Sequence, residues 1–288
     1  MYEKKENDSY LLLSEKTTSI ESSPNPFNTE AQKEKNIAIF DWDDTLFCTK
    51  YFENVKINLQ KIFDYKTDLE TENPFLKKEI LNIENSILDL FSELLENNFE
   101  IKIISNADLK WIQNCLTHFL FDLKEFIEEN QIKIYSAKNL FKNDDYFLWK
   151  KKCFRKVITE SVNFTNLKVN ILSVGDSNEE KKATLGLLKL KEFKNIKVSV
   201  LQFISNPSAN SIIKQLNYIL ENYSKIVKSK KIIHKIYIND KNLNIQVRNF
   251  LYKPKNLNNN NENKKIFKRF KINFLKKKRS FEIKNDLI

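Results

Sequence analysis

Short apolar runs alternate with amphipathic segments of helical length between residues 37 and 203, and this alternation restricts the fold more than any other feature. The run Ile37–Phe40 precedes a segment at 76–97 whose apolar residues recur close to every 3.6 positions. Four more strand-like runs follow, with helix-like segments between them: 99–104, 132–138, 169–174 and 196–203. Strands that alternate with helices predict an α/β fold, with a parallel sheet and helices on both faces.

The regions outside this alternation differ in composition. Residues 1–34 are polar, contain two prolines in SSPNPFNTE and lack an apolar period, which predicts a flexible leader. The predicted core spans 35–225. A small β-hairpin extension is expected at 226–252, because two alternating runs flank a polar turn. Residues 253–288 comprise an Asn-rich linker and a basic tail.

The formal net charge of +11 is concentrated in the C-terminal quarter. From Lys225 onward, 19 Lys and Arg residues stand against four acidic ones, whereas the preceding residues carry a small excess of acids. A basic tail with interleaved phenylalanines favours an anionic partner through 253–288: a nucleic acid, an acidic membrane surface or a cytoskeletal polymer. The open alternative is a solvated tail that reflects a bias toward lysine and asparagine.

Composition also limits the compartment. No apolar run approaches the ~20 residues of a membrane span, and the first residues make a poor secretory signal. Three widely spaced cysteines suggest neither a disulfide framework nor a zinc site, which favours a reducing environment. We therefore expect an intracellular protein without a transmembrane segment, in the cytoplasm, with the nucleus as an alternative because of the basic tail.

Polar residues follow three of the predicted strands at the point where each strand ends. They are Asp41, Asp43 and Thr45 after the first strand, Ser105 and Asn106 after the second, and Asp176, Ser177 and Glu180 after the fourth. Because ligands of open α/β sheets bind at the carboxyl ends of strands, we expect these side chains to converge. Asp44, the neighbour of Asp43, is expected to point elsewhere. Burying carboxylates this close is costly unless a cation or a set of hydrogen bonds compensates, and Mg²⁺ is the usual cation beside a phosphate.

Glycine is scarce in this chain, and its placement is informative. Of the two glycines, Gly175 stands where the fourth strand becomes the acidic loop, and Gly186 lies in the following helix-like segment. A glycine at the end of a strand predicts unusual backbone dihedrals or the close approach of another group.

Four segments resemble, in the right order, the motifs of the haloacid dehalogenase (HAD) superfamily of phosphohydrolases: DWDDTL, IISNA, the lysines of FLWKKKCF, and SVGDSNEE. The resemblance covers residues 36–204. DWDDTL with SNA, SAK, WKKKCF and GDSNEEKKA is also similar to a HAD-like group of protists. The resemblance implies a Rossmann-like HAD core and a Mg²⁺-dependent phosphatase that forms an aspartyl-phosphate.

The resemblance also implies a catalytic role for three residues. Asp41 would be the nucleophile that attacks phosphorus. Asp43 would protonate the leaving alcohol and then activate water, which favours a phosphatase over a dehalogenase. Lys150 would neutralise developing negative charge, with Lys151 and Lys152 as alternatives.

Binding roles follow from the same resemblance. Asp41, the backbone carbonyl of Asp43, and Asp176 would hold Mg²⁺, and Ser177 and Glu180 would brace these ligands. The residues expected to bind the phosphorylated substrate are Thr45, Ser105 and Asn106, with Ser105 donating to a phosphoryl oxygen and Thr45 orienting the loop.

Each motif also has a structural reading. Asp41 and Asp43 are compatible with a simple turn, Ser105 with a helix cap, and Lys150 with a solvated helix face. The short segment 51–74 predicts a minimal cap, which in this superfamily is typical of sites for large substrates. The alternative function is a catalytically silent HAD-fold scaffold whose basic tail binds an anionic partner.

Overall fold

The computed structural model describes residues 34–55, 62–63, 73–162, 168–193, 195–238 and 245–250. The predicted leader, apart from Glu34, lies outside these ranges, as do the predicted linker and basic tail and most of the predicted cap segment. What the sequence predicts for these segments stays a prediction.

The helices and strands follow one another along the chain much as the sequence predicts. In chain order they are β1 (Glu34–Phe40), α1 (Thr49–Asn54), α4 (Pro74–Glu96), β2 (Phe99–Ser105), α5 (Leu109–Phe119), α6 (Phe121–Glu129), β3 (Lys133–Ser136), α7 (Ala137–Phe141), α8 (Tyr146–Ser161), β4 (Lys168–Gly175), α9 (Asn178–Leu187), the 3₁₀ turn η1 (Lys191–Phe193), β5 (Ile196–Gln202), α10 (Ala209–Lys228), β6 (Ile233–Ile238) and β7 (Ile245–Phe250).

Among the described residues, seven strands form one sheet in the order β3-β2-β1-β4-β5-β6-β7. Every neighbouring pair is parallel except β6 and β7. The predicted α/β architecture with a Rossmann-like parallel sheet is therefore confirmed. The predicted hairpin exists as β6 and β7, and β6 also pairs with β5, so the hairpin continues the sheet. This is possible because α10 returns the chain to the edge of β5, as a parallel crossover requires.

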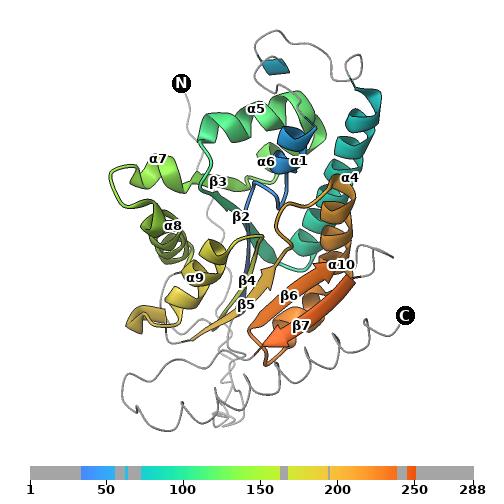
Figure 1. Cartoon of the computed structure of the whole chain (residues 1–288). Helices are drawn as coiled ribbons and strands as arrows, with labels where there is room; N and C mark the ends of the chain where they lie inside the picture. The colour runs from blue at the N-terminus through green and yellow to red at the C-terminus, as the bar shows by residue number, and fades with distance from the viewer. Residues whose placement is uncertain are drawn as a thin grey trace, which may run out of the picture. The chain divides into compact units, whose positions relative to one another are not determined.

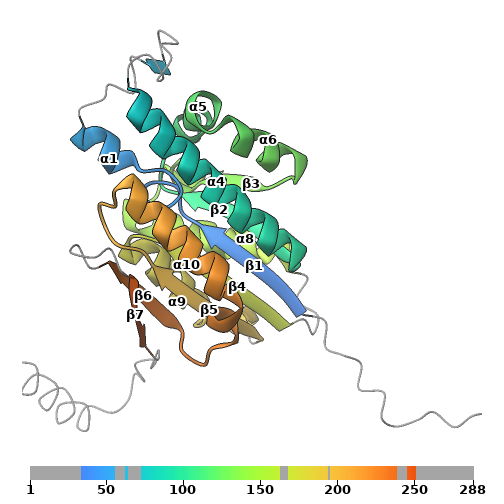
Figure 2. The same cartoon turned by 90° about the vertical axis from the view of Figure 1, so that its right-hand side faces the viewer.

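Helices cover both faces of the sheet, with α8 and α9 on one side and α4 and α10 on the other (Figure 1; Figure 2). Strand β1 explains the layering, because its successive side chains point to opposite faces. Ala38 and Phe40 belong to the apolar cluster that contains residues of α4 and α10. Ile37 and Ile39 belong to the cluster that contains residues of α8 and α9. A strand buried on both faces must be apolar throughout, as this run is.

Two helical segments differ from what their apolar patterns predict. The stripe from Asp108 to Phe119 predicts one helix, which is α5, and a second helix, α6, follows it directly after Leu120, whose φ of −131° is not helical. No side chain at the start of α6 caps it; instead the buried Glu84 of α4 accepts a hydrogen bond from Leu123 N at 2.9 Å. The apolar pattern between the fourth and fifth strand-like runs predicts a helix over 179–193, and the observed helix α9 ends at Leu187.

The described residues also show the character of the helices and the state of the cysteines. None of these helices is both long and apolar enough to cross a bilayer. Cys48, Cys115 and Cys153 are free and buried. Burial raises the pKa of Cys48 and of Cys153 to about 12, which keeps these thiols protonated and unsuited to nucleophilic chemistry.

Candidate functional site

Three acidic side chains converge beyond the ends of β1 and β4. Asp41 follows β1 directly, Asp176 follows β4, and Glu180 lies in the first turn of α9. One carboxylate oxygen from each residue lies within 4.8 Å of the other two. All three residues are buried. The central pair of strands therefore ends in a concentrated negative charge, in the place where the sequence predicts a site.

Lys150 supplies the positive charge at this cluster. Its Nζ lies 2.7 Å from Asp41 Oδ1 and also forms an ion pair with Glu180 Oε1. The ammonium group is almost completely buried together with both carboxylates. Lys150 thus joins the end of β1 to the first turn of α9.

The helical phase of α8 explains why Lys150, rather than its neighbours, reaches the cluster. The buried residues of α8 are Lys150, Cys153, Phe154, Val157 and Ile158. This spacing of three and four residues defines one helix face, and Lys150 is its first member. Lys151 and Lys152 lie off that face and are exposed, and Lys152 forms an ion pair with Asp144.

Burial raises the pKa of two of the three acids, and Lys150 lowers that of the third. Burial raises the pKa of Asp41 to about 8 despite the neighbouring ammonium of Lys150. Burial, followed by the charges of Glu180 and Asp44, raises the pKa of Asp176 to about 6. Glu180 differs, because the charge and hydrogen bond of Lys150 outweigh burial and hold its pKa below the ordinary value. The pKa of Lys150 is raised, since its two carboxylate partners outweigh burial.

The cluster fits a divalent cation. One ammonium group cannot neutralise three carboxylates, so the fully ionised cluster carries two excess negative charges. Among the described residues, the buried Asp176 carboxylate has neither a hydrogen-bond donor nor an ion-pair partner, which buried carboxylates normally require. All three potential ligands are carboxylate oxygens, which hard cations such as Mg²⁺ prefer. Asp41, Asp176 and Glu180 could therefore hold a metal ion.

Gly175 makes room for Glu180. A Cβ atom at this glycine would lie 2.8 Å from Glu180 Cδ, and still closer to Cγ. The backbone φ of Gly175 is not positive, so of the two predicted reasons for glycine the close approach applies. Glu180 is fixed there by Lys150 and by a capping box, in which its Oε2 accepts hydrogen bonds from Ser177 N at 3.0 Å and Ser177 Oγ at 2.5 Å.

The loop after β1 folds back on one carbonyl group. Asp41 N still donates to Val174 O of β4 at 3.0 Å, and the Trp42 carbonyl then accepts from the backbone N–H groups of Thr45, Leu46 and Phe47. Asp44 adopts a φ of 54° at the turn, which Asp tolerates better than most residues.

Asp43 is held by two donors that the sequence did not reveal. Thr49 Oγ1 and Trp111 Nε1 both donate to Asp43 Oδ1, at 2.5 Å and 3.0 Å. Burial raises the pKa of Asp43, and these two hydrogen bonds oppose the rise. Trp111 belongs to α5, far along the chain, so only the folded structure brings it to this loop.

A hollow of about 250 Å³ opens onto the acids. Ser105 and Asn106, at the end of β2, both line it as predicted for strand-end residues. Ser105 Oγ accepts from Ala107 N at 3.1 Å, and Asp108 rather than Ser105 caps α5. Asn106 Nδ2 donates to Glu179 Oε2 at 2.9 Å.

The structure differs from the sequence prediction at two residues of the first loop, Thr45 and Asp44. Thr45 does not line the hollow, and its buried Oγ1 has no hydrogen-bond partner among the described residues. Asp44, which was expected to point elsewhere, does line the hollow, and its carboxylate accepts from Lys50 N at 3.0 Å and pairs with Lys50 Nζ at 3.1 Å.

Comparison of the chain with protein-family models, with curated proteins and with solved structures gives no match. The fold and the site therefore define the class by themselves. In its described part the chain is an α/β protein with a mostly parallel seven-stranded sheet, and it carries a buried acidic cluster able to hold a metal at the carboxyl ends of the central strands.

Proposed function

We propose that this protein is a metal-dependent phosphohydrolase that cleaves phosphomonoesters through an aspartyl-phosphate on Asp41. The observation that carries the proposal is the convergence of Asp41, Asp176, Glu180 and Lys150 beyond β1 and β4. The resemblance to the HAD superfamily supports it, because the segments that carry the resemblance are the ones that supply these side chains. Together they provide a nucleophile, a cation and a metal site around one hollow.

Mg²⁺ is the metal we propose. Asp41, Asp176 and the backbone carbonyl of Asp43 would hold it, while Glu180 braces the arrangement through Lys150 and Ser177. When bound, a divalent ion would neutralise the two excess negative charges and polarise a phosphoryl oxygen.

Asp41 and Lys150 would carry out the first chemical step. A carboxylate oxygen of Asp41 attacks phosphorus, and the bond between phosphorus and the ester oxygen breaks. The Lys150 ammonium, 2.7 Å from Asp41 Oδ1, stabilises the negative charge that develops on the phosphoryl oxygens. Ser105 and Asn106, which line the hollow, would hydrogen-bond those oxygens.

Asp43 would move the protons. Its raised pKa favours the protonated form that the leaving alcohol requires. After the alcohol departs with that proton, the Asp43 carboxylate accepts a proton from water, which attacks phosphorus and releases phosphate and free Asp41. Because Thr49 and Trp111 both donate to Oδ1, Oδ2 is the oxygen available for these transfers.

The test is hydrolysis of an aryl phosphate with Mg²⁺ by the parent protein and by Asp41→Asn. The variant should lose about a thousandfold or more in kcat/KM, because the amide cannot attack phosphorus. Asp89→Asn, the same chemical change at an exposed position on α4, should leave turnover unchanged. Rapid quenching followed by mass spectrometry should find phosphate on the peptide that contains Asp41. Undiminished turnover by Asp41→Asn would disprove the mechanism.

The silent-scaffold alternative makes the opposite prediction in the same assay. The intact protein would hydrolyse none of a panel of phosphorylated metabolites and phosphopeptides, whatever the metal. Binding to an anionic polymer or vesicle would disappear on deletion of residues 253–288. That pair of results would replace the phosphohydrolase proposal.

A further inference from the structure

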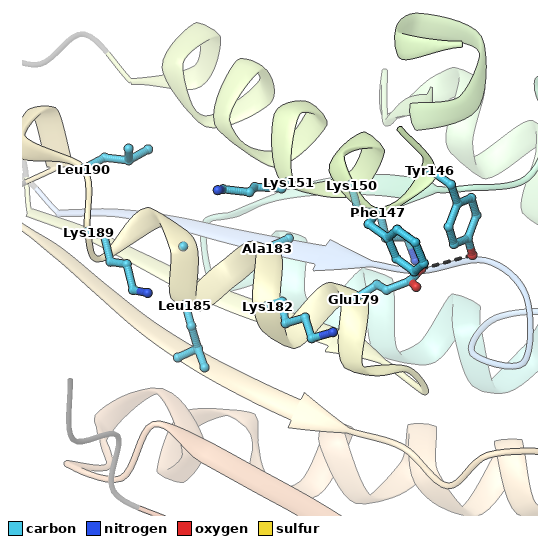
Figure 3. Close-up of a pocket in the computed structure, with 11 residues that line it drawn as sticks. Tyr146, Phe147, Lys150, Lys151, Glu179, Lys182, Ala183, Leu185, Lys189 and Leu190 are labelled. Atoms are coloured by element: carbon cyan, nitrogen blue, oxygen red, sulfur yellow. Dashed lines mark hydrogen bonds between the residues drawn. The ribbon is translucent and has the colours of Figure 1, made fainter. Parts of the chain in front are cut away.

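A second and larger hollow lies between α8 and α9, beside the acidic cluster. Its volume is about 520 Å³, twice that of the hollow over the acids. The two hollows share Tyr146, Lys150 and Glu179 as lining residues, so they adjoin. Figure 3 shows Tyr146 and Glu179 at one end of this groove and Lys189 and Leu190 at the other. We call it the α8–α9 groove.

Unpaired lysines give the α8–α9 groove a positive charge. Lys151, Lys182 and Lys189 line it, and none of them has a hydrogen bond or ion pair with another side chain in the described parts of the chain. Glu179 is the one carboxylate among the lining residues, and it accepts hydrogen bonds from Asn106 and from Tyr146.

The other exposed cations of α8 contrast with Lys151. Lys152, Arg155 and Lys156 point away from the groove, and each forms an ion pair, with Asp144, Glu192 and Glu160 respectively. On α8, the exposed lysine that faces the groove is thus the one without an acidic partner. A set of cations left unpaired around a hollow is complementary to an anionic ligand.

The rest of the lining combines aliphatic residues with two aromatic rings. Leu185 and Leu190 are half-buried in it, and Phe147 is 79% exposed near the end that adjoins the acids. The ten residues of α9 span about 15 Å, which matches four or five residues of an extended polypeptide. Single-stranded nucleic acid needs a series of exposed rings on which bases stack. The two rings of this lining, Tyr146 and Phe147, lie together at the end beside Glu179, and the other end offers Leu190.

We propose that the α8–α9 groove binds an extended, acidic polypeptide segment with aliphatic side chains, and that the phosphorylated residue of this segment enters the adjoining acidic hollow. The substrate would then be a phosphoprotein. Binding in the groove requires no catalysis, whereas the position of the phosphorylated residue rests on the proposed function. The lysines recognise the acidic side chains, and the leucines accept the aliphatic ones.

The test measures fluorescence anisotropy of a short fluorescein-labelled peptide in which phosphoserine is followed by alternating glutamate and leucine. All proteins in this test carry Asp41→Asn, so that the peptide is not consumed, and the protein with this substitution alone is the parent for the comparison. Reversing the groove charge with Lys151→Glu, Lys182→Glu and Lys189→Glu together should weaken binding about tenfold to a hundredfold. Affinity for the parent should also fall as salt is added, because exposed charges are screened.

A matched control separates the groove from net charge. Lys78→Glu, Lys124→Glu and Lys225→Glu together change the net charge equally at positions on α4, α6 and α10 that do not line the groove. This triple variant should bind the peptide within about twofold of the parent. Equal weakening by both triple variants would overturn the proposal. So would a single-stranded RNA of equal charge that binds more tightly than the peptide and displaces it.

A second variant fills the groove without changing charge. A Cβ on Gly186 would have room, since its nearest neighbour would be Lys151 Cε at 3.8 Å, and Gly186 lines the groove. Gly186→Leu should therefore fold and should weaken peptide binding severalfold, and unchanged affinity would count against the groove. If the peptide binds through the groove while no phosphate ester is hydrolysed, only the proposed function fails. If aryl phosphate is hydrolysed while peptide affinity is unchanged in both groove variants, only the groove proposal fails.

Discussion

The two ends of β1 and β4 differ in how well their charged side chains are neutralised. At the amino end, Glu34 pairs with Lys168 on the surface. At the carboxyl end, three buried acids share the single ammonium of Lys150. Nearby on the amino side, Glu100 has two cations to itself, Lys35 at 2.7 Å and Lys102. Since uncompensated buried charge costs stability, its presence at one end marks the place where the fold gives up stability for a site.

Replacing the lysine at each end should give the largest difference in unfolding free energy between the two ends. Lys150→Met leaves Asp41 and Glu180 facing each other without a cation, which should cost about 3–5 kcal/mol of unfolding free energy without metal. Lys168→Met breaks an exposed pair and should cost at most about 1 kcal/mol. Denaturant unfolding with a chelator present measures both. Equal losses would remove the distinction between the two ends.

Neutralising an acid on each side should have effects of opposite sign. The folded-state pKa of Asp176 is raised to about 6, so the folded protein loses stability as Asp176 ionises between about pH 4 and 6. Asp176→Asn should therefore stabilise the metal-free protein at pH 7.5, by on the order of 2 kcal/mol, and should abolish stabilisation by Mg²⁺.

Glu100→Gln is the matching substitution on the amino side, to be compared with Asp176→Asn. Its lysine partners outweigh burial and lower the pKa of Glu100, so the carboxylate stabilises the fold above its ordinary pKa, and that contribution is lost as pH falls. The glutamine variant should be less stable than the parent at pH 7.5. Thermal unfolding of both variants across pH checks the signs, and destabilisation by Asp176→Asn would contradict our account of the acidic end.

The two glycines should respond differently to an added methyl group, because Gly175 is crowded by Glu180 and Gly186 is not. Gly175→Ala presses a methyl group against the fixed side chain of Glu180 and should cost about 1–3 kcal/mol. Gly186→Ala meets only an ordinary contact at 3.8 Å and improves helix propensity, so it should gain about 0.5–1 kcal/mol. Denaturant unfolding measures both. A neutral Gly175→Ala would show that Glu180 moves freely.

Metal affinity should depend on pH only through the acidic end. Asp176 and Asp41, with pKa values raised to about 6 and about 8, must lose protons to bind a cation. Affinity for Mg²⁺ should therefore rise by up to about tenfold per pH unit between pH 6 and 8. Calorimetry in buffers of different ionisation enthalpy would count the protons released. A flat profile would mean that other groups bind the metal.

Much of the site could be predicted from local sequence. The end of a parallel strand is marked by the change from apolar residues to Asp41 or to Gly175-Asp176, and topology then brings such ends together. The choice of Lys150 was also available, because it begins the stripe at positions 150, 153, 154, 157 and 158 that buries α8.

The remaining parts could not be predicted because they depend on contacts between distant elements. Thr49 and Trp111 meet at Asp43 only after α5 packs beside the first loop, and neither residue type is unusual in its segment. The same holds for Tyr146 and Glu179, which join α8 to α9. The pairing of β6 with β5 depends on where α10 returns the chain, and periodicity within a segment does not encode that.

The register of β6 determines how far along the sheet the last described strand ends. Ile233 pairs with Val200, which is level with Ser173 of β4 and Ile39 of β1, so β6 begins beside the carboxyl half of the parallel strands. Because β7 runs against its neighbours, Phe250 ends at that same level, whereas Glu34 begins β1 at the amino end. A fusion partner joined directly at Glu34 is therefore attached at the end of β1 remote from Asp41, and one joined directly at Phe250 is attached on the side of the sheet where the acids lie.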